Sequence, residues 1–315
     1  MSDMTTGFHT TTFDTPDARA AAAALPVGER QWMVKRLLVG YPTFRRLLDN
    51  IQRLHRPVEG GTHDTGVIGG VLALPRSGKS FACESYWRRN PVRITEGGEC
   101  HPVVYLQVRD DWTPHHMAEA IYFATGAKSI PRLKTSAMIT GAIRRLLEAR
   151  TELVIVDDAH FAFLGTKGRT LSNYRSIIKG IADTNACNVL LSGLPDLRAF
   201  VEADSQIQGR GDFPCWHIEP LRWGMADERE QFSLLLHAID RRLPFRDLSG
   251  LASPRNATHF HRISQGVIGR VMNVVRDAAN RAIDAGSSMI LEEHLQEAAD
   301  CRATPGQDFR PFRDK

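Results

Sequence analysis

The sequence lacks any uninterrupted apolar segment long enough to cross a membrane. A transmembrane helix needs about 20 such residues, and polar or charged residues interrupt every apolar stretch of this 315-residue chain before that length. The start of the chain is rich in threonine and lacks the basic-then-apolar order of a secretion signal. We therefore expect a cytoplasmic protein with no membrane partner.

The sequence also has few cysteines and little excess charge. Five cysteines occur, at positions 83, 100, 187, 215 and 301, with no CxxC pair and no metal-ligand spacing. Such a pattern excludes a disulfide scaffold and is typical of reduced thiols in a cytosolic protein. The net charge is only +4, which permits contact with nucleic acid without requiring it.

Apolar residues are abundant and are arranged in alternating strand and helix patterns. Short apolar runs predict strands at Val71–Leu74, Val103–Val108, Leu153–Val156, Asn188–Leu191 and Cys215–Ile218. Helical patterns separate these runs, which indicates an α/β fold with a parallel sheet covered by helices on both faces. After Pro220 only helical patterns remain, at Asp227–Asp240, Ile263–Ala285 and Leu291–Ala299.

These patterns divide the chain into five predicted segments. We expect a flexible N-terminal segment (1–28), a helical lead-in (29–60) that Pro42 breaks in two, an α/β nucleotide-binding core (61–222), a small helical lid domain (223–300) and an extended C-terminal tail (301–315).

The strongest local signal is the segment from Ala73 to Ser80, which reads ALPRSGKS. It follows a predicted strand and opens a predicted helix, which is the context of a phosphate-binding Walker A loop. Glycine lets backbone N–H groups approach phosphate oxygens, and the helix N-terminus favours an anion. Lys79 would reach the β- and γ-phosphates, and Ser80 would bind Mg²⁺. The predicted nucleotide-binding residues of this loop are Pro75, Arg76, Ser77, Gly78, Lys79, Ser80 and Phe81.

The second signal is the segment LVIVDD from Leu153 to Asp158. A buried strand that ends in acidic residues has the form of a Walker B motif. Asp157 would hold Mg²⁺, directly or through water. Asp158 would orient and deprotonate the attacking water, although its side chain is one methylene shorter than glutamate. By itself the segment could be a core strand followed by an acidic helix cap, but its order after the Walker A loop favours an ATPase.

Three further residues fit roles near a bound nucleotide. Ser192 ends the strand that follows the Walker B strand and could position the water, or it could be an ordinary serine of a turn. Arg210 precedes the last predicted strand and is a candidate arginine finger that completes a neighbouring subunit's site. Arg270 lies near the start of a helix in the lid and could contact phosphates. Either arginine could also be an ordinary surface residue.

The order of Lys79, Asp157, Ser192, Arg210 and Arg270 resembles that of AAA+ ATPases. More narrowly, the chain resembles the TniB/TnsC family of transposition regulators over roughly residues 29 to 300. The segments that carry this resemblance are Glu29-Arg30, Tyr41-Pro42, VIVDDAH (154–160), LSGLP (191–195) and IEPL (218–221).

The resemblance implies a function and partners. Members of this family bind ATP and Mg²⁺, assemble with themselves into rings or helical filaments on double-stranded DNA, and recruit or activate a transposase. They also interact with a target-selection protein. In such proteins the segment before the Walker B strand faces DNA, so the resemblance implies phosphate contacts by Arg109, Lys128, Arg132, Lys134 and Thr135.

Other functions stay open at this stage. A nucleotide-stabilised scaffold with little hydrolysis is favoured by Asp158, and another AAA+ role, such as helicase loading, fits the same motifs. A P-loop phosphotransferase for a small molecule is disfavoured by the helical C-terminal part, and no acceptor pocket is evident from the sequence.

Overall fold

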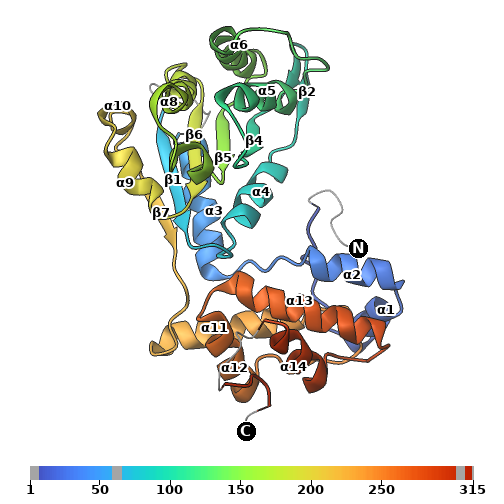
Figure 1. The fold of residues 1–315 in the computed structure, drawn as a ribbon. Helices are drawn as coiled ribbons and strands as arrows, with labels where there is room; N and C mark the ends of the chain where they lie inside the picture. Colours follow the sequence, from blue (N-terminus) through green and yellow to red (C-terminus); the bar gives the residue numbers. More distant parts are fainter. Residues whose placement is uncertain (1–6, 59–65, 303–308, 314–315) are drawn as a thin grey trace. The chain divides into compact units, whose positions relative to one another are not determined.

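The computed structural model describes residues 7–58, 66–302 and 309–313. The chain forms two compact units (Figure 1). The α/β unit comprises residues 42–218, and the helical unit combines residues up to Tyr41 with those from Glu219 onward. The predicted lead-in (29–60) is therefore divided between the two units, and the core begins at residue 42 and not at 61. No helix in the described residues is long and apolar enough to cross a membrane.

The α/β unit is built on a five-stranded parallel sheet. Its strands lie in the order β4-β5-β6-β1-β7. The strands are β1 (Ile68–Ala73), β4 (Val103–Gln107), β5 (Leu153–Asp157), β6 (Asn188–Gly193) and β7 (Cys215–Ile218). All five predicted strands are present, so the predicted α/β class with a parallel sheet is confirmed. Because the strands are parallel, their carboxyl ends meet at one edge of the sheet.

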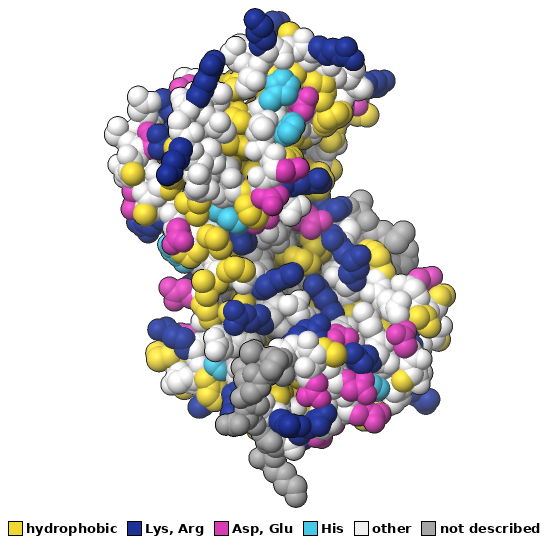
Figure 2. Space-filling model, viewed as in Figure 1, with side chains coloured by type: hydrophobic (Ala, Val, Ile, Leu, Met, Phe, Trp, Pro, Cys, Tyr) yellow, Lys and Arg dark blue, Asp and Glu magenta, His cyan; other side chains and the backbone are white. Residues whose placement is uncertain are grey.

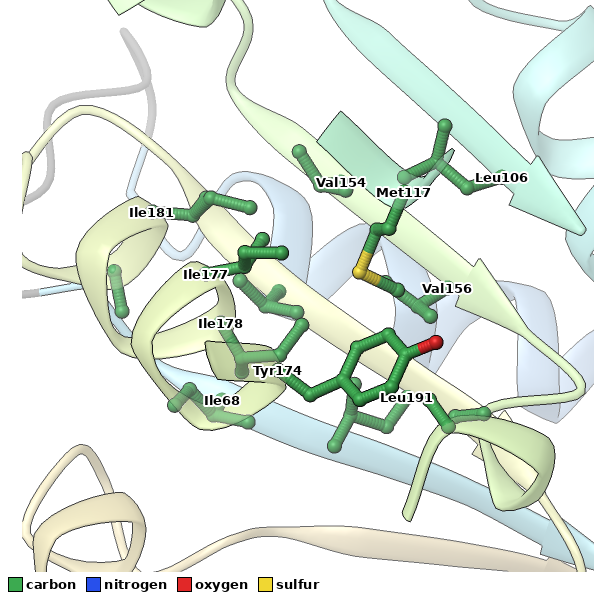
Figure 3. Packing of buried hydrophobic residues seen from close by; sticks show 14 of the residues in the cluster. Ile68, Leu106, Met117, Val154, Val156, Tyr174, Ile177, Ile178, Ile181 and Leu191 are labelled. Atoms are coloured by element: carbon green, nitrogen blue, oxygen red, sulfur yellow. The ribbon is translucent and has the colours of Figure 1, made fainter. Parts of the chain in front are cut away.

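Helices cover both faces of this sheet (Figure 1). On one face lie α3 (Pro42–His55) and α4 (Lys79–Arg88), and on the other α5 (Pro114–Ala124), α8 (Gly168–Ala182) and α9 (Leu197–Glu202), with α6 (Thr135–Glu148) against α5 and α8. Tyr174, Ile177 and Ile181 recur on one side of α8 at helical spacing and pack on the sheet (Figure 3). The short helices α7 (His160–Phe163) and α10 (Ser205–Gln208) follow β5 and α9.

A small hairpin in this unit was not predicted. Strands β2 (Arg93–Thr95) and β3 (Gly98–Cys100) pair antiparallel outside the main sheet. Each has only three residues, and the side chain of Ile94 is 89% exposed. An exposed hairpin shows no buried apolar alternation, which is the signal that strand prediction depends on.

The helical unit has its own apolar core. Its helices are α1 (Pro16–Ala23), α2 (Val27–Lys35), α11 (Ala226–Asp240), α12 (Pro254–Ser264), α13 (Ile268–Asp284) and α14 (Glu292–Asp300). Phe232, Phe260 and Val275 are fully buried members of this core cluster. Pro16 and Pro254 each begin a helix after a capping Thr15 or Ser253, whose side chain accepts a backbone N–H of the first turn.

The predicted flexible segment (1–28) is folded over its described part, residues 7–28. Phe8 and Phe13 are buried, and helix α1 follows them. Arg19 is also buried, and its guanidinium donates to the carbonyl oxygens of Arg246 and Asp247. These contacts join residues more than 200 positions apart, so no local pattern could predict them.

The single helix predicted over Ile263–Ala285 is two helices. α12 ends at Ser264, and Gln265 (φ 52°) and Gly266 (φ 75°) turn the chain before α13 begins at Ile268. A Cβ on Gly266 would lie 2.1 Å from the carbonyl oxygen of Leu221. Only glycine combines this close approach with a left-handed backbone.

The predicted extended tail (301–315) instead forms a docked turn where it is described near its end. The side chain of Phe312 is fully buried against His259 and Phe260. Its carbonyl oxygen accepts hydrogen bonds from Arg255 and Gln296, each 3.0 Å, and its N–H donates to Nδ1 of His259. The last described turn of the chain is thus part of the helical unit's core.

Candidate nucleotide-binding site

The predicted phosphate-binding loop joins the carboxyl end of β1 to the N-terminus of α4. Strand β1 ends at Ala73, and α4 begins at Lys79. Arg76 (φ 65°) and Gly78 (φ 95°) have left-handed backbones, and Gly78 is the N-cap of α4. A Cβ at Gly78 would meet nothing within 4 Å, so the backbone conformation is what requires glycine there. The unpaired N–H groups of the first turn of α4 form an anion-binding end.

Two polar side chains of the loop are buried without partners. Lys79 is 6% exposed as a whole residue and forms no hydrogen bond or ion pair with any residue that the structure describes. The Ser77 hydroxyl is buried and also has no hydrogen-bond partner among these residues. A buried hydroxyl without a partner is costly, and Lys79 holds a cation in the same stretch of chain. A bound polyphosphate would supply the missing charge and acceptors, so this loop fits a nucleotide.

Asp157 ends strand β5 and is fully buried. Its Oδ1 accepts hydrogen bonds from the Ser192 hydroxyl at 2.6 Å and from the backbone N–H of Asp158 at 3.0 Å. Its Oδ2 accepts one from the Tyr105 hydroxyl at 2.8 Å. Burial, reinforced by the charge of Asp157, raises the pKa of Tyr105, so its hydroxyl stays protonated and donates. The structure thus brings Asp157 and Ser192 together, because β5 and β6 are neighbours.

Asp158 and His160 lie beside this carboxylate. Asp158 has a left-handed backbone (φ 54°), which aspartate tolerates better than most residues. Burial lowers the pKa of His160. The negative charge of Asp158 acts in the opposite direction, and the positive charge of Lys79 lowers the pKa further. His160 Nδ1 is buried and has no partner among the described residues. A neutral imidazole therefore lines the space near Lys79 and Asp158.

Ser80 and Asp157 are the residues that could hold Mg²⁺. Ser80 lies in the first turn of α4, and Asp157 is the last residue of strand β5. No group of three or more histidine, cysteine, aspartate or glutamate side chains in the described chain could hold a metal by itself. Mg²⁺ typically binds through one or two protein oxygens and the phosphates of its nucleotide. The donor set present fits that mode of binding.

The two predicted arginines belong to different units of the chain. Arg210 follows α10, and its Nε donates to Asp183 at the end of α8 at 2.7 Å. The side chain of Arg210 is 18% exposed. Arg270 is an exposed residue in the first turn of α13, in the helical unit. Their roles toward a nucleotide stay predictions.

The predicted DNA-contacting residues lie on exposed segments next to α5. Arg109 precedes α5, and Lys128, Arg132 and Lys134 are exposed in the segment between α5 and α6. Part of that segment runs back along α5, so that Arg132 and Lys134 line a surface hollow of about 600 Å³ with His115 and Glu119. Thr135 begins α6. Figure 2 shows several Lys and Arg side chains over the end of the unit that carries α5 and α6.

Sequence reasoning missed two residues of this site. Tyr105 is the one hydroxyl-bearing residue in the strand VVYLQ, which lies beside the Walker B strand. This single polar group in an apolar strand is the sequence feature that could have indicated its role. Cys83 lies one turn after Lys79 and is fully buried. Burial, with the nearby Asp157 charge, raises the pKa of its thiol well above the usual value. Cys83 is therefore a packing residue of the site.

A comparison with protein families decides the identity of the chain. The family model described as "Bacterial TniB protein" matches residues 30–217. The chain belongs to the TniB family. The resemblance inferred from the motifs is thus confirmed. No curated protein sequence matches this TniB-family chain.

Solved structures confirm the AAA+ fold of this TniB-family chain. It is similar to the Orc1 protein of Aeropyrum pernix in complex with DNA, with 15% identity and a TM-score of 0.61 over 84% of this chain and 66% of that chain. Cdc6p of Pyrobaculum aerophilum has 14% identity and a TM-score of 0.55 over 83% and 67%. The Aeropyrum pernix ORC2 protein, in ADPNP-ADP complexes, has 12% identity and a TM-score of 0.56 over 81% and 66%. The TniB-family chain spans about two thirds of the length of these proteins.

Proposed function

We propose that this TniB-family protein is a Mg²⁺-dependent ATPase that assembles on double-stranded DNA and recruits or activates a transposase. A target-selection protein would be a further partner. The observation that supports the nucleotide part of this proposal is Lys79, a residue without an ion-pair partner among the described residues, at the junction of the loop after β1 with α4. The TniB family match supports the DNA and transposition part.

In this proposal the residues of the site bind the phosphates, hold the metal and position the water. Lys79 and the N–H groups around Gly78 bind the phosphates. Ser80 and Asp157 hold Mg²⁺, which supplies charge neutralisation at the phosphates when bound. Asp158 orients the attacking water and accepts its proton, and Ser192 positions the water or the carboxylate of Asp157. Arg210 of a neighbouring copy and Arg270 neutralise developing charge, which links hydrolysis to assembly.

DNA would bind through its phosphates. Lys128, Arg132 and Lys134 are exposed cations on one segment, and backbone contacts require cations and not base-reading side chains. The Aeropyrum pernix Orc1 protein, which shares the fold, was solved in complex with DNA. We expect the affinity for DNA to fall as salt rises and to depend little on sequence.

The experiment that tests this function compares assembly with and without nucleotide. Sedimentation of the protein with duplex DNA is measured without nucleotide, with ADP, and with a slowly hydrolysed ATP analogue, each with Mg²⁺. Large DNA-bound assemblies should form with the analogue and not with ADP. Assembly that is the same in all three conditions would contradict nucleotide control, and adding the transposase then tests recruitment.

The shorter side chain of Asp158 favours a second candidate function. A carboxylate one methylene short of glutamate reaches the water less well, so the protein could be a nucleotide-stabilised scaffold with little hydrolysis. Phosphate release from Mg·ATP, measured with and without DNA, separates the two. A rate no higher than that of an Asp158→Asn variant would favour the scaffold.

A further inference from the structure

The carboxylate of Asp157 has nearly all of its acceptor positions filled. An ionised carboxylate offers about four lone-pair positions, two on each oxygen. Oδ1 accepts from the Ser192 hydroxyl and from the Asp158 N–H, and Oδ2 accepts from the Tyr105 hydroxyl. Within the part of the chain that is described, one position on Oδ2 therefore remains. Any metal or metal-bound water that Asp157 meets must use that position.

Tyr105 is held rigidly where it makes this contact. It lies in the middle of β4, opposite Ile155, so its side chain shares a face with Asp157 two residues further along β5. Its ring stacks on Trp87 of α4, with centroids 5.7 Å apart and planes 20° from parallel. Strand and stack both fix the ring, and a phenylalanine at this position would keep both contacts while losing only the hydroxyl.

The other two donors both contact the same oxygen of the carboxylate. Ser192 and the Asp158 N–H bind Oδ1, so neither of them occupies a lone pair of Oδ2. Tyr105 is the only donor to Oδ2 among the described residues. A carboxylate held at both oxygens has one orientation, and its one remaining lone pair then has one direction.

We propose that Tyr105 is a positioning residue for Mg²⁺, because it fixes the Asp157 carboxylate in the orientation that leaves a single Oδ2 position for the metal or its bound water. This inference rests on the proposed function, since it needs a nucleotide site that uses Mg²⁺. Replacing a residue that hydrogen-bonds to a metal-binding carboxylate typically lowers the metal affinity about 10- to 100-fold.

The experiment uses the variant Tyr105→Phe and the matched control Tyr86→Phe. Tyr86 is also a buried tyrosine of this unit, but its hydroxyl contacts His55 and Gln52. Binding of a fluorescent ATP analogue is measured in EDTA and then across a Mg²⁺ titration. For Tyr105→Phe we expect the half-saturating Mg²⁺ concentration to rise about tenfold, while binding in EDTA changes less than about twofold. Tyr86→Phe should leave both quantities at the wild-type values.

Three outcomes separate this inference from the proposed function. A Mg²⁺ midpoint for Tyr105→Phe that is unchanged or lower would overturn the inference, because the hydroxyl would then be neutral or a competitor of the metal. Equal weakening in EDTA and in Mg²⁺ would also overturn it, because it would indicate general damage to the site. A wild-type chain that binds no nucleotide would overturn the proposed function itself. Thermal unfolding of both variants without nucleotide checks that each is folded.

Discussion

At the scale of single residues, the site is fixed by a few buried polar groups at the carboxyl edge of the sheet. The types and spacing of Lys79, Asp157 and Ser192 could be predicted from sequence. Lys79 begins the helix after an apolar strand and its loop, and Asp157 and Ser192 lie at the ends of apolar strands. The contact between Tyr105 and Asp157 could not, because it depends on β4 pairing with β5 and not on order in the chain. The ion pair of Arg210 with Asp183 could not be predicted either, because it depends on how separate segments of the chain pack together.

Replacing Asp158 by asparagine should abolish most hydrolysis and leave nucleotide binding intact. The amide keeps the size of the side chain but cannot accept the proton of the attacking water. General-base removal typically lowers the rate about 10²- to 10⁴-fold. The measurement is phosphate release under saturating Mg·ATP, with nucleotide affinity measured in parallel. A variant that hydrolyses ATP at the wild-type rate would show that Asp158 is not the base.

At the scale of helices and strands, a partly buried polar network joins the end of α3 to the start of β5. Glu152 contacts Nε2 of His55 at 2.9 Å and Nε of Arg56 at 2.7 Å. Burial by itself would raise the pKa of Glu152, but the hydrogen bonds from His55 and Arg56 lower it from 4.5 to about 2. Because the folded pKa lies below the unfolded one, this stabilisation is fully present above pH 4.5 and is lost as pH falls towards about 2.

We therefore expect Glu152→Gln to remove part of the acid sensitivity of the α/β unit. At neutral pH the variant should lose on the order of 2 kcal/mol of unfolding free energy, allowing for solvent screening of the half-exposed pair. The difference from wild type should shrink as the pH falls below about 4. Urea unfolding at several pH values measures this, with the exposed Glu148→Gln as the control. A difference that is constant with pH would contradict the assignment.

The turn at Phe312 gives a second prediction at this scale. Phe312 packs against Phe260 of α12 and accepts a hydrogen bond from Gln296 of α14. Its backbone is left-handed (φ 62°), a conformation that a bulky residue adopts only when its contacts compensate for the strain. Truncation to alanine should cost the helical unit about 3 kcal/mol. Phe309→Ala, at the half-buried ring that stacks on His259, should cost less. Calorimetric unfolding that is the same for Phe312→Ala and wild type would show that the turn is not part of the core.

The secondary structure was predictable where apolar patterns were long and local. Strands β1, β5 and β6 were predicted because each buries every residue, whereas β4 and β7 are short apolar runs that are only partly buried. The break at Gln265-Gly266 was missed because apolar spacing continues across it, and only the approach to Leu221 shows why the chain turns. The folded N-terminal segment was missed because Phe8 and Phe13 are isolated in a threonine-rich stretch, and their contacts with Arg36 and with the backbone of Arg241 are distant in the chain.

At the scale of the whole molecule, the described N-terminal and C-terminal segments belong to one unit. Residues up to Tyr41 fold with those after Glu219, while the α/β unit is one continuous segment. Sequence reasoning predicted a boundary near residue 222, where strand patterns end. It could not predict that the N-terminal helices join the same unit, since that follows from contacts such as Arg19 with Asp247.

Assembly gives the prediction at this scale. If Arg210 completes the site of a neighbouring copy, Arg210→Ala should bind nucleotide normally but lose nucleotide-driven assembly. Its hydrolysis should fall about 10³-fold or more, as for other arginine fingers. The control is Arg198→Ala, which removes an exposed arginine paired with Glu202 on α9. Sedimentation with the slowly hydrolysed analogue measures assembly. If the Arg210→Ala variant assembles fully, Arg210 is not part of the interface between copies.

The measurement that tests the central claim most directly is the nucleotide affinity of Lys79→Ala. Lys79 is buried without a partner among the described residues, and removing its charge should cost about 3 kcal/mol of binding free energy, or about 100-fold in Kd for Mg·ATP. Lys128→Ala, an exposed lysine of the same unit, should bind like wild type. If Lys79→Ala binds Mg·ATP within about twofold of the wild-type Kd, the loop after β1 does not hold the phosphates.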